Sequence, residues 1–203
     1  MSKVDQIFNE SKSILDFTSG YFSYLKNLID GIDHNTIEEI ITVFLEARES
    51  GKTIYFIGNG GSAATCSHFA NDIGYGTRTY KKPFKVLSLT DNNAVLTALG
   101  NDEGYGEIFK KQLEVLATKD DIVVAISASG NSPNIVKALE YASELGCKTI
   151  GLSGFDGGKL KQMTDICLHV DSPKGDYGPV EDLHMIFDHL ISNYLMRKVR
   201  EEL

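Results

Sequence analysis

The chain has 203 residues, 42% of them hydrophobic, which is enough for a single α/β domain over residues 1–203 with an ordinary core. Its formal net charge of −8 argues against a nucleic-acid partner, because binding to phosphate backbones requires clustered Lys and Arg. The three cysteines form no C-x-x-C pair, and neither a signal peptide nor a membrane-spanning apolar run is visible, so we expect a cytoplasmic protein without membrane contact.

The first fifty residues have the periodicity of amphipathic helices and predict a helical N-terminal extension over residues 1–50. Apolar side chains recur on one side at Ile7, Ile14, Phe17, Tyr21, Leu25 and Leu28, and again at Ile37, Ile40, Ile41, Phe44 and Leu45. We therefore expect two helices before the first strand. The first is apolar around much of its circumference, which predicts packing against another subunit. The alternative is that it covers the sheet of its own chain.

After Gly51, short apolar runs alternate with helix-compatible stretches. We expect strands at Ile54–Ile57, Lys85–Leu89, Ile122–Ile126, Thr149–Leu152 and Ile166–Val170. We expect helices that begin at Ser62, Asn92, Ser132 and Gly157, and a last long helix after Pro179. This order predicts a doubly wound, five-stranded parallel sheet flanked by helices. Ligands bind such sheets beyond the carboxyl ends of the strands.

Two of these strands end in turns that are rich in glycine and serine. The first turn is Gly58-Asn59-Gly60-Gly61-Ser62, and the second is Ser127-Ala128-Ser129-Gly130-Asn131-Ser132. Each leads into a helix, so backbone N–H groups and hydroxyls would gather where the helix dipole favours an anion. Three serines in six residues favour a phosphomonoester over a dinucleotide. The alternative is that both turns are ordinary helix caps.

Two pairs of potential ligands or proton-transfer groups lie on helices near these turns. His68 and Asp72 are four residues apart and share a helix face. Glu181 and His189 lie about 80° apart in projection on the last helix. Two carboxylates and two imidazoles could hold a divalent metal, zinc above all, and leave a position open for substrate oxygens.

Without a metal the same residues would supply a general base and a general acid. For any one of them, an ordinary solvated helix face is the alternative. His184 and Asp188 also lie on the last helix, but we expect them to point elsewhere.

Taken together, these motifs resemble a known family. They are Gly58–Ser62 followed by His68-Phe69-Ala70, Ile126–Ser132, Thr149–Gly158 and Glu181–His189. The chain resembles the SIS-domain phosphosugar isomerases over nearly its whole length, and among them those that act on sedoheptulose 7-phosphate. The resemblance implies a single SIS domain, a homotetramer with active sites between subunits, and a role in making activated heptoses for bacterial surface polysaccharides.

The resemblance also assigns residues to the binding of the substrate. It implies phosphate contacts at Ser62, Ser127, Ser129 and Ser132, and a first turn shaped by Asn59, Gly60 and Gly61. It implies substrate-side carboxylates at Asp102 and Glu181.

Catalytic and metal-binding roles follow in the same way. The family's base is a Glu at the position of Asp72, and its partner histidine falls on His189. Some members bind zinc through these two positions, through the histidine at His68, and through a Gln at the position of Glu181. The expected zinc ligands are therefore His68, Asp72, Glu181 and His189. Asp is one methylene shorter than Glu, which moves the base by about an ångström.

We therefore expect an aldose–ketose isomerase that needs no organic cofactor. The serine turns would fix the phosphate, Asp72 would remove a carbon-bound proton to give a cis-enediol, and His189 would move the second proton. Two alternatives belong to other classes: a SIS module that senses sugar phosphates, and a tetrameric scaffold that binds the bacterial replication initiator. The presence of His68, Asp72 and His189 argues against a purely scaffolding role.

Overall fold

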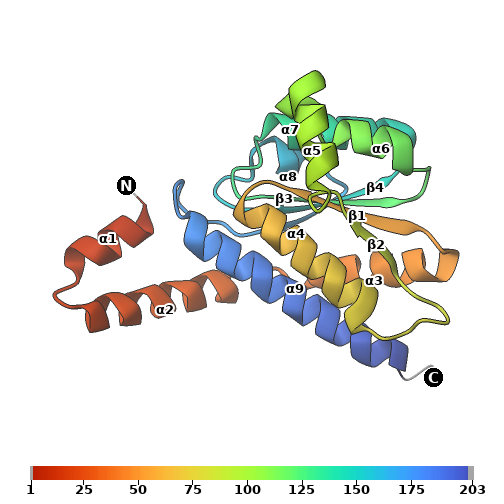
Figure 1. Ribbon diagram of the computed structural model, residues 1–203. Helices are drawn as coiled ribbons and strands as arrows, with labels where there is room; N and C mark the ends of the chain where they lie inside the picture. Colours follow the sequence, from red (N-terminus) through yellow and green to blue (C-terminus); the bar gives the residue numbers. More distant parts are fainter. Residues whose placement is uncertain (1, 201–203) are drawn as a thin grey trace.

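The computed structural model describes residues 2–200. Within that range, five strands form one parallel sheet in the order β2-β1-β3-β4-β5 (Figure 1). The strands are β1 (Thr53–Gly58), β2 (Lys85–Ser88), β3 (Ile122–Ser127), β4 (Lys148–Ser153) and β5 (Ile166–His169). Each strand lies within one residue, at either end, of the range expected from the sequence, and the predicted fold class is confirmed.

Helices cover both faces of the sheet (Figure 1). One layer contains α3 (His34–Ser50), α4 (Gly61–Asn71) and α9 (Tyr177–Arg200). The other contains α5 (Asn93–Asp102), α6 (Lys110–Leu116), α7 (Pro133–Leu145) and α8 (Gly158–Met163). Alternate residues of each central strand enter the two layers, so Phe56 and Val124 pack in the first and Tyr55 and Val123 in the second.

The N-terminal extension differs from the prediction. In the described part of the chain, three helices precede β1, because the expected first helix is split into α1 (Lys3–Glu10) and α2 (Ile14–Asp30). Three successive polar residues cause the break. Ser11 donates its hydroxyl proton to the Ile7 carbonyl, and the Ser13 hydroxyl caps α2 by accepting from the Asp16 N–H group.

The segment Lys3–Asp30, here called the helical arm, projects from one side of the body (Figure 1). Hydrogen bonds tie it to the segment that begins α9. Tyr24 donates to the Asp176 carboxylate over 2.8 Å, and Tyr21 donates to Asp182 over 2.6 Å. The end of α2 contributes Tyr24 and Leu28 to the core, but Phe22 remains 65% exposed. The arm therefore does not cover the sheet of its own chain.

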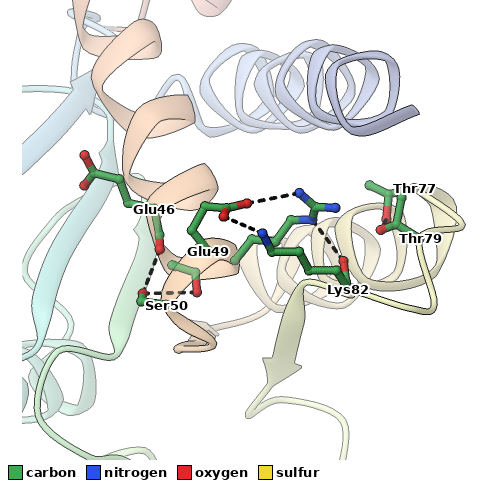
Figure 2. Close-up of polar contacts among 8 residues, drawn as sticks. Glu46, Glu49, Ser50, Thr77, Thr79 and Lys82 are labelled. Carbon is green, nitrogen blue, oxygen red and sulfur yellow. Dashed lines mark hydrogen bonds and ion pairs between the residues drawn. The ribbon is translucent and has the colours of Figure 1, made fainter. Parts of the chain in front are cut away.

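A second set of polar contacts fastens the loop before β2 to the end of α3. Buried Arg48 donates from Nε to the Lys82 carbonyl over 2.9 Å, and its guanidinium lies 5.6 Å from the centre of the Phe84 ring. Glu49 accepts from the Lys82 ammonium (Figure 2). This clamp fixes the chain that follows Asp72, which is a candidate site residue.

The last helix begins three residues earlier than expected, at Tyr177, so Pro179 lies in its first turn. A proline is tolerated there because the first N–H groups of a helix have no intrahelical acceptor. No helix among residues 2–200 combines the length and the apolar character that crossing a bilayer requires.

Candidate active site

The turn after β1 forms the N-terminus of α4. Gly60 has φ +55°, a left-handed conformation that favours glycine, and α4 starts at the next residue. Ser62 is buried in the first helical turn. The free N–H groups of this turn give it the anion preference that the sequence predicts.

The turn after β3 is held in shape by its own serines. The Ser127 hydroxyl accepts from the Gly130 N–H group at 3.2 Å, and the Ser129 hydroxyl accepts from the Asn131 N–H group at 3.4 Å. Gly130 has φ +62°, and a Cβ at this position would lie 2.0 Å from the Gly157 carbonyl oxygen. Only glycine fits that contact. Ser132 then stands at the N-cap of α7.

The two turns lie side by side because β1 and β3 are neighbours in the sheet. Gly58 pairs with Ile126, which places both turns at the same edge. Asn59 and Asn134 exchange amide hydrogen bonds of 3.0 and 2.8 Å, and Tyr105 donates to the Asn59 amide oxygen over 2.9 Å. In a parallel sheet with the order β2-β1-β3-β4-β5, successive strands are added on one side of β1 and then on the other, so the strand order switches between β1 and β3. Such folds bind ligands at this switch point.

Neither Tyr105 nor Asn134 was predicted as a site residue. Tyr105 lies in a short 3-10 helix, Tyr105–Glu107, between α5 and α6, and Asn134 is in the first turn of α7. No periodic pattern marks an amide or phenol of this kind. Their proximity to Asn59 depends on how the two layers pack.

A cluster of imidazoles and carboxylates lies between α4 and α9, which pack against each other. The Nε2 atoms of His68 and His189 are 3.4 Å apart, and His68 Nε2 is 3.5 Å from an Asp72 carboxylate oxygen. Sequence reasoning expected these three residues to meet. They come from two helices whose first turns are far apart in the chain.

Asp188 also belongs to this cluster, which corrects the expectation that it points elsewhere. One potential ligand atom from each of His68, Asp72, Asp188 and His189 lies within 4.8 Å of the others. Asp188 is fully buried. Its position could have been found in the sequence, because it lies on the buried stripe of α9 with His184, four residues before it, and Ile191, three residues after it.

Burial dominates the electrostatics of Asp188. Desolvation, aided by the nearby Asp72 charge, raises the pKa of the Asp188 carboxyl to about 8. Among the described residues, neither of its carboxylate oxygens has a hydrogen-bond partner. Such an orphaned buried carboxylate is costly unless a cation or a proton satisfies it.

Glu181 lies outside this cluster, at the other end of the same helix face. A Cβ on Gly61 would be 2.4 Å from a Glu181 carboxylate oxygen, so this carboxylate rests against the first turn of α4. Burial, with a smaller contribution from Asp182, raises the pKa of Glu181. The structure thus associates Glu181 with the serine turn and separates it from its expected co-ligands.

Asp102 ends α5 and is exposed. Its carboxylate accepts from the Asn101 amide over 2.7 Å. It takes no part in the cluster between α4 and α9, and its expected substrate contact stays a prediction.

Asp72 begins a π-helical segment, Asp72–Gly76, that continues α4 and that the sequence pattern did not reveal. A π segment inserts one extra residue per turn and re-aims the side chains around it, and such segments are frequent at functional sites. Two glycines, Gly74 and Gly76, lie in this segment on either side of Tyr75. The expected base therefore lies at an irregularity of the helix.

The donor set and its spacing fit a divalent metal. Two nitrogen ligands at tetrahedral zinc are about 3.4 Å apart, given Zn–N bonds of about 2.0–2.1 Å. The observed Nε2–Nε2 separation is 3.4 Å, whereas a direct N–H···N hydrogen bond would be shorter. The orphaned oxygens of Asp188 are a second sign that a cation belongs here.

Comparison with known proteins agrees with the family resemblance of the sequence motifs. The model of the SIS domain family matches residues 20–154. A protein of Aliarcobacter butzleri named phosphoheptose isomerase is 42% identical over 155 residues, which cover 76% of this chain and 81% of the relative. The chain belongs to the phosphoheptose isomerase family of SIS-domain proteins.

Solved structures of phosphoheptose isomerases have the same fold. The enzyme of Neisseria gonorrhoeae superposes with a TM-score of 0.82 at 28% identity, over 90% of this chain and 98% of that one. That of Francisella tularensis gives 0.82 at 29% identity, over 91% and 99%. The match includes most of this chain, so the helical arm or part of it belongs to the shared fold.

Proposed function

We propose that the protein is an aldose–ketose isomerase that converts sedoheptulose 7-phosphate to a heptose 7-phosphate for activated-heptose synthesis. The observation that carries this proposal is the placement of two joined serine turns and an imidazole–carboxylate cluster along α4. His68 lies six residues after Ser62, about 9 Å along the helix axis. That distance is comparable with the length of an extended seven-carbon sugar phosphate.

Phosphate binding is assigned to the serine turns. Ser62, Ser127, Ser129 and Ser132 would donate hydroxyl protons to the phosphate oxygens, and the N-termini of α4 and α7 would add their dipoles. These donors are neutral, and dipoles rather than cations balance the ligand charge. Asn59, held by Asn134 and Tyr105, would keep the two turns at a fixed separation.

Proton transfer is assigned to Asp72 and His189. Asp72 would take the proton from C1 of the ketose, and the electron pair of the C–H bond would form the C1–C2 double bond of a cis-enediol. His189 would move a proton between the oxygens on C1 and C2. Return of a proton to C2 gives the aldose, so no electrons leave the substrate and no organic cofactor is needed.

We also propose that the cluster holds zinc, with His68, Asp72 and His189 among its ligands. A bound zinc ion would act as a Lewis acid toward the sugar oxygens. His68 would then serve to hold the ion, while Asp72 and His189 would lie next to the reacting carbons.

A homotetramer with active sites between subunits is the proposed assembly. The exposed apolar side chains of the helical arm support it, because Ile14, Leu15 and Phe22 are 84%, 78% and 65% exposed. A cavity of about 1080 Å³ lies along the edge strand β2 and not at the serine turns. A site that another subunit completes would be open in the single chain.

Exchange of carbon-bound protons tests the reaction. The purified protein is incubated with sedoheptulose 7-phosphate in D2O, and deuterium incorporation and aldose formation are followed by NMR. An isomerase introduces deuterium at C2 of the product and shows exchange at C1. A sensor or a scaffold would bind the sugar phosphate without exchange, and that result would refute the proposal.

A further inference from the structure

The cluster between α4 and α9 contains one carboxylate for which the proposed reaction has no use. Asp188 is fully buried, and among the described residues neither of its oxygens has a hydrogen-bond partner. One of these oxygens lies within 4.8 Å of ligand atoms of His68, Asp72 and His189. The carboxylate is therefore aimed at the group proposed to bind a metal.

We propose that Asp188 is a direct metal ligand, and that it completes the site with His68, Asp72 and His189 in place of Glu181. This inference deepens the proposed function, because it fixes the donor set of the same site. Its test measures metal binding directly, so it can fail or succeed independently of the isomerase reaction.

Charge balance favours this donor set. Two carboxylates and two neutral imidazoles make a divalent ion formally neutral, which suits a buried position. Without the ion, Asp188 would be a buried carboxylate with no satisfied oxygen, and the neighbouring Asp72 would repel it. A cation at this place removes both penalties.

Geometry separates Asp188 from Glu181. Asp188 adjoins His189 in sequence and approaches the cluster from the buried side of α9. Glu181 lies two turns earlier, and its carboxylate rests against Gly61 at the start of α4. Glu181 would have to leave that position to reach the imidazoles, whereas an oxygen of Asp188 already lies within 4.8 Å of a ligand atom of each imidazole.

The proposal also accounts for the short side chain at position 72. Asp72 reaches about an ångström less far than a glutamate would. A second carboxylate at Asp188, supplied from the facing helix, brings an oxygen ligand in from the other side. Asp188 and the two imidazoles, whose Nε2 atoms lie 3.4 Å apart, would then hold the ion together with the shorter Asp72.

Zinc titration of the metal-free protein tests the assignment. The full-length protein is treated with chelator, and zinc binding is measured by calorimetry for the wild type, Asp188→Asn and Glu181→Gln. Both substitutions keep the side-chain shape and remove one charge. We expect Asp188→Asn to weaken zinc binding by about 100-fold or more, since even outer-shell partners contribute about 10–100-fold. Glu181→Gln should keep the affinity within about threefold.

Thermal unfolding gives a second readout that does not depend on activity. Zinc should raise the Tm of the wild type and of Glu181→Gln, and should leave that of Asp188→Asn nearly unchanged. In the absence of metal, Asp188→Asn should be at least as stable as the wild type, because it removes a buried carboxyl group whose ionisation is costly. A cooperative transition at that Tm would also show that the variant folds.

Equal zinc affinity in Asp188→Asn and the wild type would overturn the proposal, as would a loss of zinc binding confined to Glu181→Gln. If Asp188→Asn loses zinc while the wild type shows no proton exchange with sugar phosphates, the donor set stands and the isomerase function fails. If the wild type exchanges protons and Asp188→Asn keeps its zinc, the isomerase function stands and the donor set fails.

Discussion

The Nε2 atoms of His68 on α4 and His189 on α9 face each other at 3.4 Å. The lone pairs of two such nitrogen atoms repel each other at this distance unless a cation or a proton lies between them. Because α4 starts at one serine turn and packs along α9, this contact ties the phosphate-binding edge of the sheet to the proposed chemistry. Four predictions follow from that arrangement and from the surrounding fold.

Replacing Ser129 and Ser132 together with Ala should weaken the binding of sedoheptulose 7-phosphate by about 100-fold or more. Each hydrogen bond to a charged group contributes about 1.5–3 kcal/mol. Calorimetry on the double variant measures the change. Ser23→Ala, on the exposed side of α2, is the matched control and should bind as the wild type does. Unchanged affinity in the double variant would remove these serines from the phosphate site.

Asp72→Asn should lower kcat by about 10²–10⁴-fold, since it removes the proposed general base while preserving the shape of the side chain. The KM for the sugar phosphate should change little, because the phosphate contacts lie in the serine turns. Steady-state kinetics and C1 proton exchange measure the two effects. Glu38→Gln, an exposed change on α3, serves as the control. A variant with near-normal exchange would show that another group is the base.

His184 should make stability depend on pH. It is fully buried, and burial is the main reason that its pKa falls from 6.5 to about 4. As the pH falls through 6.5, the unfolded chain takes up a proton that the folded protein cannot accept until about pH 4. Stability is therefore lost on acidification, by up to about 3 kcal/mol across that window.

The measurement compares the free energy of unfolding of the wild type with that of His184→Asn at several pH values. This difference isolates His184 from other titrating groups, Asp188 among them. Between pH 6.5 and pH 4, the free energy of unfolding of the wild type should fall by about 3 kcal/mol more than that of His184→Asn. The same substitution at the exposed His34 is the matched control. A constant difference for His184→Asn would contradict the prediction.

Phe22→Asp should dissociate the oligomer. Phe22 is 65% exposed in the single chain, so a charge there has little effect on folding but would be buried in a subunit interface. Light scattering should give the wild type four times the chain mass of 22.3 kDa and the variant a smaller mass. Thr42→Asp adds the same charge on the exposed side of α3 and should leave the mass unchanged. A wild-type mass near that of one chain would rule out the assembly.

Most of the fold could be predicted from the sequence, because its strongest signals are local. Apolar runs such as Ile122–Ile126, bounded by turn residues, mark the buried strands of a parallel sheet. The break at Ser11–Ser13 was missed because the apolar period continues across it, and only the hydrogen bonds of those serines end one helix and begin another. The π segment at Asp72–Gly76 was missed for a related reason, since no residue type specifies it.

The site was predicted less completely, because its composition depends on packing between elements. Projection angles correctly brought His68 close to Asp72, since Asp72 lies where the π-helical segment continues α4. The same reasoning grouped Glu181 with His189, but the line of contact between α4 and α9 instead places Asp188 at the cluster and Glu181 at Gly61. The pairing of Asn59 with Asn134 likewise required the two strands to be adjacent.

The hydrophobic clusters on the two faces of the sheet have no buried side chain in common. Phe69 of α4 belongs to one and Ile135 of α7 to the other. A substrate held by both serine turns would therefore contact elements from two layers whose interiors are packed separately. Repacking the interior around Leu139, behind α7, would shift one anchor of the phosphate and leave the histidines in place. Mutations behind α7 could thus change the affinity for the phosphorylated end without disturbing the histidines at the reacting end.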